Sequence, residues 1–231
     1  MIKVPKVEEM LKAGMHFGHR TNRWHPKMKP YIFTSKNGVY IINLKKSQEK
    51  LQEALEFIAK LVSEGKSILF VGTKSQVSLP LKKMAVETGQ AYVVGKWLGG
   101  YLTNFSMVKR SVKKYLDLIE KRDSGKLDKY TKKERLNFDR EIKKLEERVG
   151  GVSVLTKLPD ALFVWDTKEE LTAVKEARQK NIPIIAVCDT NVNPEEVNYP
   201  IPANDDSTKT IELVLSSIKE AIIDGQKNLK K

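Results

Sequence analysis

Four short, uninterrupted runs of apolar residues constrain the fold of this chain more than any other feature. Their residues do not alternate with polar ones, and a continuous apolar run is typical of a strand covered on both faces by helices. The runs are Ser67–Val71, Ala91–Val94, Ala161–Trp165 and Ile184–Val187. They predict a parallel sheet buried in the middle of the molecule.

Helical patterns stand between and after these runs, over residues 48–64, 168–180 and 207–223. In the first pattern an apolar stripe repeats every three or four residues, and we expect Ser47 to cap its start and Gly65 to end it. Alternating strands and helices predict a doubly wound α/β/α sandwich with a parallel sheet. A hairpin is predicted before the sandwich, over residues 31–43, because Asn37-Gly38 is a strong turn signal.

Residues 106–149 break this alternation with two apolar seams that share a spacing of four, three and four residues. The seams are Val108, Val112, Tyr115 and Ile119, then Phe138, Ile142, Leu145 and Val149. Narrow seams with charged flanks favour an antiparallel helical hairpin that projects from the sandwich as an insertion. The sandwich would then comprise residues 1–105 and 150–231. The alternative is two ordinary helices packed on the sheet.

The net charge of +13 is distributed unevenly along the chain. Residues 1–50 carry 11 Lys and Arg against 3 acidic residues, and residues 106–149 carry 15 against 9. Residues 160–231 are acidic, with 9 Lys and Arg against 13 acidic residues. We expect the basic segments to share a face that meets a polyanion, with the acidic edge left for protein partners. Nucleic acid is the expected polyanion, and a membrane surface is disfavoured because no amphipathic anchor is found.

The chain has no apolar stretch near the roughly 20 residues that span a bilayer, and its first residues lack the apolar region of a signal peptide. The single cysteine, Cys188, lies in an apolar run and is expected to be a buried, reduced side chain. These features predict a cytoplasmic protein.

The segment Val71–Ser75 (VGTKS) follows a predicted strand and precedes a helix, where phosphate-binding loops lie. It does not match a Walker loop, because Thr73 separates Gly72 from Lys74 and position 67 is not glycine. Backbone N–H groups and Lys74 could still hold one phosphate of an RNA backbone. The alternative is a plain turn between a strand and a helix.

The segment Lys96–Phe105 (KWLGGYLTNF) combines aromatic residues with two glycines. The glycines permit close backbone approach, the aromatic rings offer stacking surface, and Asn104 is expected to cap the following helix. The first turns of that helix carry Lys109, Arg110, Lys113 and Lys114. This combination suits an RNA backbone and its unstacked bases. The alternative places Trp97 in the core and the glycines in a turn, and both interpretations can hold.

Residues 14–30 (GMHFGHRTNRWHPKMKP) contain all three histidines of the chain and no acidic residue. The histidine spacing matches no closed zinc signature, and the segment offers no nucleophile or carboxylate for acid–base catalysis. Basic side chains around Trp24, with two prolines, favour a rigid segment that contacts RNA. We call residues 14–30 the basic strap.

The acidic end of the chain has its own pattern. CDTN (residues 188–191) follows a predicted strand, and NDDS (residues 204–207) opens a helix. Both lie at the carboxyl edge of the sheet, where open α/β sheets bind ligands. Asp189, Asp205 and Asp206 are therefore either a strand end and a helix cap or oxygen ligands for a divalent cation.

Together these motifs, in their order and spacing, resemble the family of the second protein of the bacterial small ribosomal subunit. The motifs are AGMHFGHRTNRWHPKMKPYI, LFVGTK, KWLGGYLTNF, LPDALFVWDT and CDTN with IPANDD. The resemblance covers the chain from about Val7 to Gly225. His25 stands where the family usually has Asn. Lys96 stands where Arg is usual, which gives up bidentate phosphate geometry.

The resemblance implies a flavodoxin-like domain with an inserted coiled-coil hairpin. It implies a structural protein, not an enzyme, that binds small-subunit rRNA where the head meets the body of the subunit. Partners would include neighbouring ribosomal proteins and the mRNA-binding ribosomal protein one, which this family helps to dock. The lack of a transit peptide favours a bacterial, ribosome-bound protein over a plastid one.

The residues expected to contact RNA lie in the basic strap, the hairpin, the two loops and the helix after them. They are Arg20, Arg23, Trp24, Lys27, Lys29, Lys36, Lys74, Lys96, Trp97, Asn104, Lys109, Arg110, Lys113 and Lys114. No cofactor is required, but the resemblance implies a divalent metal, zinc or magnesium, where ribosomal protein one docks. The matching positions are His19, Asp189, Asp205 and Asp206, with an Asp–His ion pair as the alternative.

Two other classes of function stay open from the residues alone. A nucleotide- or small-molecule-binding enzyme would use the carboxyl-edge crevice, with Asp189 and Asp206 on Mg²⁺, but no glycine fingerprint or nucleophile–base pair supports it. A general protein-interaction scaffold would sediment free of ribosomes.

Overall fold

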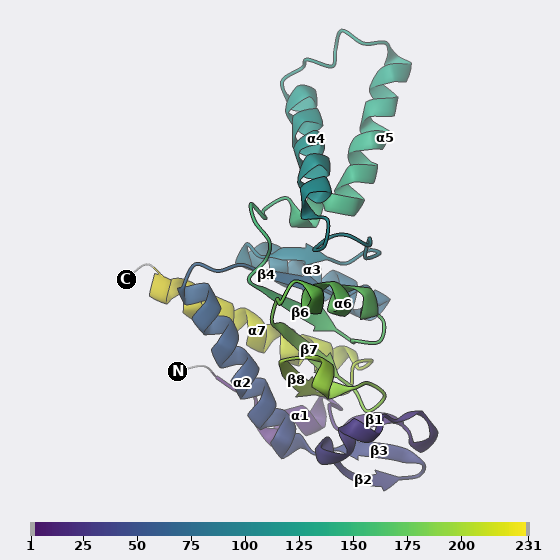
Figure 1. Cartoon of the computed structure of the whole chain (residues 1–231), viewed down its shortest axis with the longest axis vertical. Coiled ribbons are helices and arrows are strands. Elements are labelled where there is room, and N and C mark those ends of the chain that lie inside the picture. Colours follow the sequence, from purple (N-terminus) through teal and green to yellow (C-terminus); the bar gives the residue numbers. More distant parts are fainter. Residues whose placement is uncertain (1–2, 230–231) are drawn as a thin grey trace.

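A five-stranded parallel sheet forms the centre of the computed structural model, which describes residues 3–229 (Figure 1). The strands are β4 (Ile68–Val71), β5 (Ala91–Val93), β6 (Ala161–Trp165), β7 (Ile184–Cys188) and β8 (Tyr199–Pro202). They lie in the order β5-β4-β6-β7-β8, and all neighbouring strands are parallel. Counted within the sheet this order is 2-1-3-4-5, that of doubly wound folds of the flavodoxin type. The four predicted strands are confirmed, and β8 is a strand that the apolar runs do not predict.

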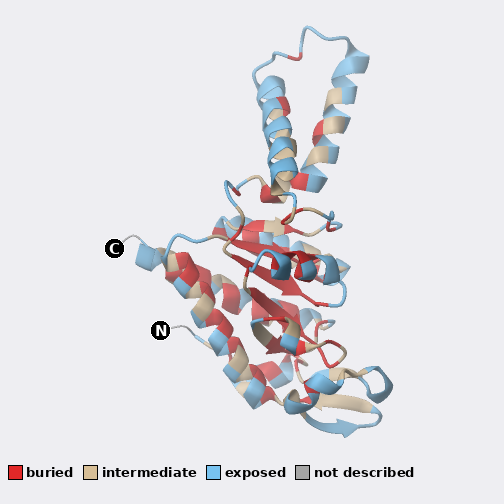
Figure 2. Cartoon of the chain, viewed as in Figure 1, coloured by how far each residue is buried: buried red, intermediate tan, exposed pale blue. Residues whose placement is uncertain are grey.

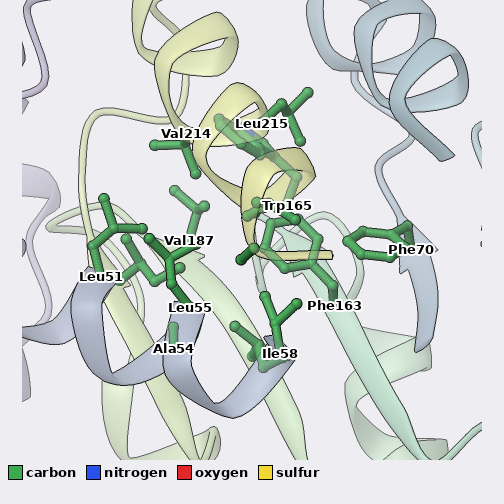
Figure 3. Packing of buried hydrophobic residues seen from close by; sticks show 14 of the residues in the cluster. Leu51, Ala54, Leu55, Ile58, Phe70, Phe163, Trp165, Val187, Val214 and Leu215 are labelled. Atoms are coloured by element: carbon green, nitrogen blue, oxygen red, sulfur yellow. The ribbon is translucent and has the colours of Figure 1, made fainter. Parts of the chain in front are cut away.

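Both faces of the sheet are buried, which explains why its strands are apolar throughout. On one face Phe70 and Phe163 pack against three helices, α2 (Leu44–Ser63), α3 (Ser75–Thr88) and α7 (Thr208–Leu229). Figure 3 shows side chains of α2 and α7 gathered against Phe163 and Trp165 of β6. On the other face Leu69 and Leu162 pack with α6 (Leu171–Gln179). The predicted α/β/α sandwich is therefore present.

The helix boundaries differ from the sequence prediction in three places. The N-cap of α2 is Asn43, whose Oδ1 accepts the N–H groups of Lys45 and Lys46 at 3.1 and 3.4 Å. The prediction of Ser47 as the cap is wrong, because Ser47 is buried inside the helix. Gly65 does follow the helix end, with a φ of +69° that favours glycine. The helix predicted at 168–180 begins only at Leu171, and the helix predicted at 207–223 extends to Leu229.

The predicted hairpin belongs to a second, antiparallel sheet with the order β1-β3-β2. Its strands are β1 (Phe17–Arg20), β2 (Ile32–Lys36) and β3 (Val39–Ile42). Asn37 and Gly38 have φ values of 52° and 74°, which match the type I′ turn expected of an Asn-Gly pair. The short helix α1 (Val7–Lys12) precedes this sheet, and the 3-10 turns η1 (Thr21–Arg23) and η2 (Pro26–Tyr31) lie between β1 and β2.

Helices α4 (Phe105–Asp123) and α5 (Lys132–Val149) stand side by side beyond the edge strand β5 and are joined at their far ends (Figure 1). The start of α5 is set by a capping box between Thr131 and Glu134. Ile142 and Val149 are buried, whereas the outer sides of both helices are exposed (Figure 2). After α5, the turn η3 (Gly150–Val152) leads back to the sheet. No helix within residues 3–229 combines the length and apolarity needed to cross a bilayer.

Candidate RNA-binding surface and metal site

The carboxyl edge of the parallel sheet brings together charged residues that are far apart in sequence. Parallel strands end at the same edge, so the residues after β4, β6, β7 and β8 become neighbours. These residues are Lys74, Asp166, Asp189, Asp205 and Asp206. Asp166 has a φ of +69°, an unusual conformation for a residue other than glycine, immediately after β6. The edge therefore gathers one lysine and four aspartates that come from separate segments of the chain.

Lys74 lies at the centre of this edge and contacts three carboxylates. Its Nζ is 2.9 Å from Asp166 Oδ2, 2.9 Å from Asp205 Oδ2 and 3.1 Å from Asp206 Oδ1. The Lys74 side chain is only 18% exposed. Since an ammonium group has three N–H donors, each of them faces a carboxylate already. This geometry gives Lys74 an internal role, unlike the phosphate contact that its sequence context predicts.

Close packing of the Lys74 ammonium with these carboxylates shifts the pKa of both kinds of group. Burial alone would lower the pKa of Lys74, but its hydrogen bonds to Asp205 and Asp166 outweigh burial and raise it. Burial, with the charges of Asp166 and Asp189, raises the pKa of Asp205 to about 7. Lys74 therefore stays protonated, and the buried carboxyl of Asp205 is harder to ionise than an exposed aspartate.

His19 of β1 meets the same edge from the basic strap. Its Nδ1 is 3.1 Å from Asp189 Oδ2, and its Nε2 is 3.2 Å from the Nδ2 of Asn191. The hydrogen bond to Asp189 raises the pKa of His19, partly offset by burial. The strap is held here by Thr190, whose Oγ1 accepts the backbone N–H of His19 at 2.8 Å and whose carbonyl accepts that of His25 at 2.7 Å.

Three of the four predicted metal positions come together. His19, Asp189 and Asp205 each offer one ligand atom, and these atoms all lie within 4.8 Å of one another. Asp205 is 1% exposed, and its Oδ1 has no hydrogen-bond partner among the described residues. A buried carboxylate oxygen without a donor fits a cation, and one imidazole with two carboxylates suits zinc better than magnesium. Asp206 is separate from this group, because it is exposed and turned to Lys74.

The predicted cations of the strap and of β2 are exposed. They are Arg20, Arg23, Lys27, Lys29 and Lys36. Lys27 forms a surface ion pair with Glu195 at 2.9 Å. Trp24 is half-buried, and its ring lies 5.1 Å from that of Tyr40. Its ring therefore braces the strap against β3, while the charged groups around it face solvent.

The loop before α4 is held by hydrogen bonds to a glutamate of α6. Trp97 is 8% exposed, and its Nε1 donates to Glu176 at 3.0 Å. Backbone N–H groups of this loop point to the same carboxylate, so they are not available to a phosphate. Asn104 occupies the N-cap position of α4, but its side chain makes no capping hydrogen bond, so that part of the prediction is wrong. Lys96 is exposed beside the loop.

The first turns of α4 present an exposed basic face. Its members are Lys109, Arg110, Lys113 and Lys114. Lys114 pairs with Glu141 of α5. No ion pair within residues 3–229 involves Lys109, Arg110 or Lys113.

The strap and the α4 face are well separated along the molecule (Figure 1). β1, β2 and β3 lie at one end of the long axis of the molecule, and α4 and α5 lie at the other (Figure 1). The expectation of one shared basic face stays a prediction, now with its two parts at opposite ends of the molecule (Figure 1). The structure holds two exposed basic regions, separated by the sandwich.

The sequence does not single out several residues of these sites. Asp166 could have been found, since it directly follows the apolar run that forms β6. Glu170, which is 2% exposed and accepts the N–H of Thr73 at 2.8 Å, carries no local signal. Glu176 and Asn191 are likewise ordinary polar residues until the fold places partners beside them.

Comparison with known proteins identifies close relatives. A family model described as ribosomal protein S2 matches residues 10–225. The chain is 45% identical over 223 residues to small ribosomal subunit protein uS2 of Coprothermobacter proteolyticus, covering 96% of this chain and 83% of that protein. It is 50% identical over 221 residues to small ribosomal subunit protein uS2 of Chloroherpeton thalassium, covering 95% and 88%. The similarity thus spans both the sandwich and the two projecting helices.

Proposed function

Because the chain belongs to the ribosomal protein S2 family, whose relatives are named as small-subunit proteins, we propose that it is a non-catalytic component of the small ribosomal subunit. Its place would be on the bacterial ribosome in the cytoplasm, where it binds small-subunit rRNA between head and body. The observation that carries this proposal is the contrast between internal and external charge. The buried cation Lys74 is satisfied by carboxylates, whereas the cations of the strap and of α4 are exposed.

We propose two RNA contacts, one at each end of the molecule. The first is the strap with Lys36, and the second is the α4 face with Lys96. Exposed lysine and arginine side chains can neutralise phosphates and release counterions. Within residues 3–229 only Lys27 and Lys114 of this set form an ion pair, each with an exposed or partly exposed glutamate. Two separated contacts suit a protein that bridges two rRNA segments, such as one in the head and one in the body. Lys74 and the N–H groups of the loop at 97–103 are left out of this surface, because internal carboxylates hold them.

Binding to the cognate rRNA should therefore depend steeply on salt. We expect the logarithm of the affinity to fall by about 0.7 to 0.9 per phosphate contact for each tenfold increase in salt. Filter binding with an rRNA fragment from about 50 to 500 mM salt measures this slope. A nearly flat response would contradict the proposal. Sucrose-gradient fractionation of a lysate should place the protein with small subunits, whereas a free scaffold would stay at the top of the gradient.

We propose that α4 and α5 form a coiled-coil insertion, residues 106–149, in a sandwich made of residues 1–105 and 150–231. The two ends of the insertion are close, because the Tyr101 hydroxyl donates to the carbonyl of Arg148. Replacing residues 106–149 by a short Gly-Ser linker should leave a folded sandwich with a cooperative urea transition. Loss of that transition would make the two helices part of the sandwich core.

We propose that His19, Asp189 and Asp205 hold a divalent cation, with zinc favoured over magnesium. When bound, the ion would supply the positive charge that the buried Asp205 Oδ1 lacks. Asn191 faces the other ring nitrogen of His19 and would fix the orientation of the ring. Equilibrium dialysis should find about one zinc per chain. His19→Ala should abolish binding, and Asp206→Asn should retain it.

The carboxyl edge is also the proposed docking place for ribosomal protein one. Exposed apolar side chains lie nearby on α1 and β1, with Leu11 53% and Phe17 49% exposed. Exposed apolar groups at the rim of a polar site are typical of a protein interface. Purified ribosomal protein one should bind the wild-type chain and lose affinity for Phe17→Ser. Equal binding to both would place the partner elsewhere.

The enzyme alternative would place a nucleotide at the switch point between β4 and β6. The Lys74 ammonium lies at this position, already bound to Asp166 and Asp205. A ligand phosphate would have to replace these carboxylates on a buried cation, which is costly. Equilibrium dialysis with nucleotides should therefore find no tight binding, and stoichiometric binding would revive the alternative.

A further inference from the structure

The carboxylate of Glu176, in the middle of α6, accepts hydrogen bonds from five donors of one loop. Its Oε1 accepts the indole N–H of Trp97 at 3.0 Å and the backbone N–H of Gly100 at 2.8 Å. Its Oε2 accepts the backbone N–H of Leu102 and both the N–H and the hydroxyl of Thr103, each at 3.0 Å. Glu176 is 7% exposed. All five partners donate, so a carboxylate satisfies them where an amide would not.

This loop is the joint between the sandwich and α4. It connects β5, the edge strand, with the first turn of α4. Gly100 has a φ of +100°, which allows the backbone to turn its N–H toward Glu176. The Trp97 and Tyr101 rings pack at 4.8 Å, and the Tyr101 hydroxyl donates to the carbonyl of Arg148 near the end of α5. The loop held by Glu176 thus touches the bases of both projecting helices.

The return segment after α5 is fitted to the same region. A Cβ at Gly151 would come within 2.2 Å of the carbonyl oxygen of Tyr92 in β5, so only glycine permits this approach. The helices therefore meet the sandwich through tight backbone contact on one side and through the Glu176 carboxylate on the other. The segments that lead into α4 and out of α5 are thus both in close contact with the rest of the sandwich.

We propose that Glu176 is a positioning residue that locks the direction of α4 and α5 relative to the sandwich. The lock makes the basic strap and the α4 face act as one two-ended RNA-binding unit. This inference rests on the proposed function for its RNA consequence. When two linked contacts are held in the right geometry, the second contact forms at a high effective concentration, and a loose joint lowers it. Glu176 therefore affects affinity without contacting RNA.

The direct test measures the joint in the full chain without RNA. Spin labels at Lys126→Cys near the far end of the helices and Glu53→Cys on α2 report one distance, and the buried Cys188 stays unlabelled. The distance distribution should be narrow in the parent chain and clearly broader with Glu176→Gln. A distribution that stays narrow would overturn the inference. Glu169→Gln, an exposed neighbour of α6, is the matched control and should change nothing.

Hydrogen exchange provides a second measurement, and Glu176→Asp a second variant. Amides of Gly100, Leu102 and Thr103 should exchange at least tenfold faster in Glu176→Gln while those of the sheet keep their protection. Glu176→Asp keeps the charge but is too short to reach all five donors, so it should give an intermediate effect. Should Glu176→Gln fail to fold, the Asp variant decides, and full protection of the three amides there would overturn the lock.

The RNA measurement separates this inference from the proposed function. With Glu176→Gln we expect affinity for a two-segment rRNA fragment to fall about tenfold while the salt slope stays unchanged, because the phosphate contacts are still present. A wild-type chain that binds no rRNA would end the proposed function but leave the distance test valid. A wild-type chain that binds, with Glu176→Gln binding equally well, would overturn the positioning role alone.

Discussion

The carboxyl edge of the sheet and the outer face of α4 both concentrate charge, but they treat it in opposite ways. At the edge, Lys74 is 18% exposed and contacts three carboxylates, with all partners drawn from the same chain. On α4, Lys109 and Lys113 are exposed and form no ion pair within the described residues. The first region uses its charges within the fold, and the second leaves its charges exposed to solvent.

This difference follows from what burial does to an ion. Removing a charge from water costs several kcal/mol, so a buried ion is tolerated only with well-placed partners, and those partners are then unavailable to a ligand. An exposed cation costs the fold almost nothing and gains little from a surface ion pair. Exposure and partners therefore tell more about a lysine's function than the sequence pattern around it.

Lys74→Met removes the buried cation of the carboxyl edge, and of the variants discussed it should have the largest effect on stability. It leaves Asp166, Asp205 and Asp206 without their cation, and breaking a buried ion pair costs about 3 to 5 kcal/mol of unfolding free energy. Lys113→Met, the exposed control, should change the unfolding free energy by less than about 0.5 kcal/mol. Urea unfolding at pH 7 measures both. Similar values for the two variants would mean that burial does not distinguish these lysines.

Added zinc should stabilise the folded protein by binding at the carboxyl edge of the sheet. At a free concentration 100 times its dissociation constant, an ion that binds only the folded chain adds about 2.7 kcal/mol to the unfolding free energy. His19→Ala should lose this gain, and Asp206→Asn, outside the three-residue group, should keep it. Thermal unfolding with and without zinc provides the measurement. An equal gain in His19→Ala would place the ion at other residues.

Most of the fold could be predicted, because the strands buried on both faces are continuous apolar runs. The strand β8 could not, since Pro200 and Pro202 are uncommon in strands and are tolerated here at a sheet edge. Ser47 and Asn43 are both residue types that cap helices well. Asn43 is the cap because β3 ends directly before it, at Ile42. These errors arise where local preference is equal and tertiary position decides.

The site was less predictable, because its residues are separated by most of the chain. The contact between Lys74 and Asp205 joins residues 131 positions apart, so the sequence around Lys74 still suggests a phosphate loop. His19 and Asp189 could be grouped only through the family resemblance, which implied them as metal positions. Glu176 had no signal, since a glutamate within a helix usually faces solvent. The exposure of the α4 cations was easier to predict, because the exposure of a surface charge depends little on distant residues.

Glu176→Gln extends the comparison to a buried anion, because the hydrogen-bond partners of Glu176 are all uncharged donors. Burial alone would raise the pKa of Glu176, but hydrogen bonds from Thr103, Gly100 and Trp97 together lower it below the usual value near 4.5. A lowered pKa in the folded state stabilises the fold at pH values above the unfolded pKa, and this gain is lost as pH falls through the folded pKa.

We therefore expect Glu176→Gln to lose about 2 kcal/mol of unfolding free energy from pH 7 down to about pH 5, because several buried donors lose their charged acceptor. Below that range the difference from wild type should shrink, since the wild-type carboxylate becomes protonated. Urea unfolding at a series of pH values gives the profile. A difference that grows as the pH falls would have the wrong sign for a depressed pKa.

The smallest effect separates two neighbouring lysines of the exposed region. Lys113 has no ion pair within residues 3–229, whereas Lys114 shares its charge with Glu141. Loss of one phosphate contact should lower rRNA affinity about fivefold at physiological salt and reduce the salt slope by about 0.7 to 0.9. Lys113→Gln should show this change, and Lys114→Gln a smaller one, because part of its charge is already compensated within the chain. Filter binding across salt concentrations tests the pair. A larger effect at Lys114 would show that an internal partner does not withdraw a surface lysine from RNA, and the rule drawn from Lys74 would then hold only for buried charge.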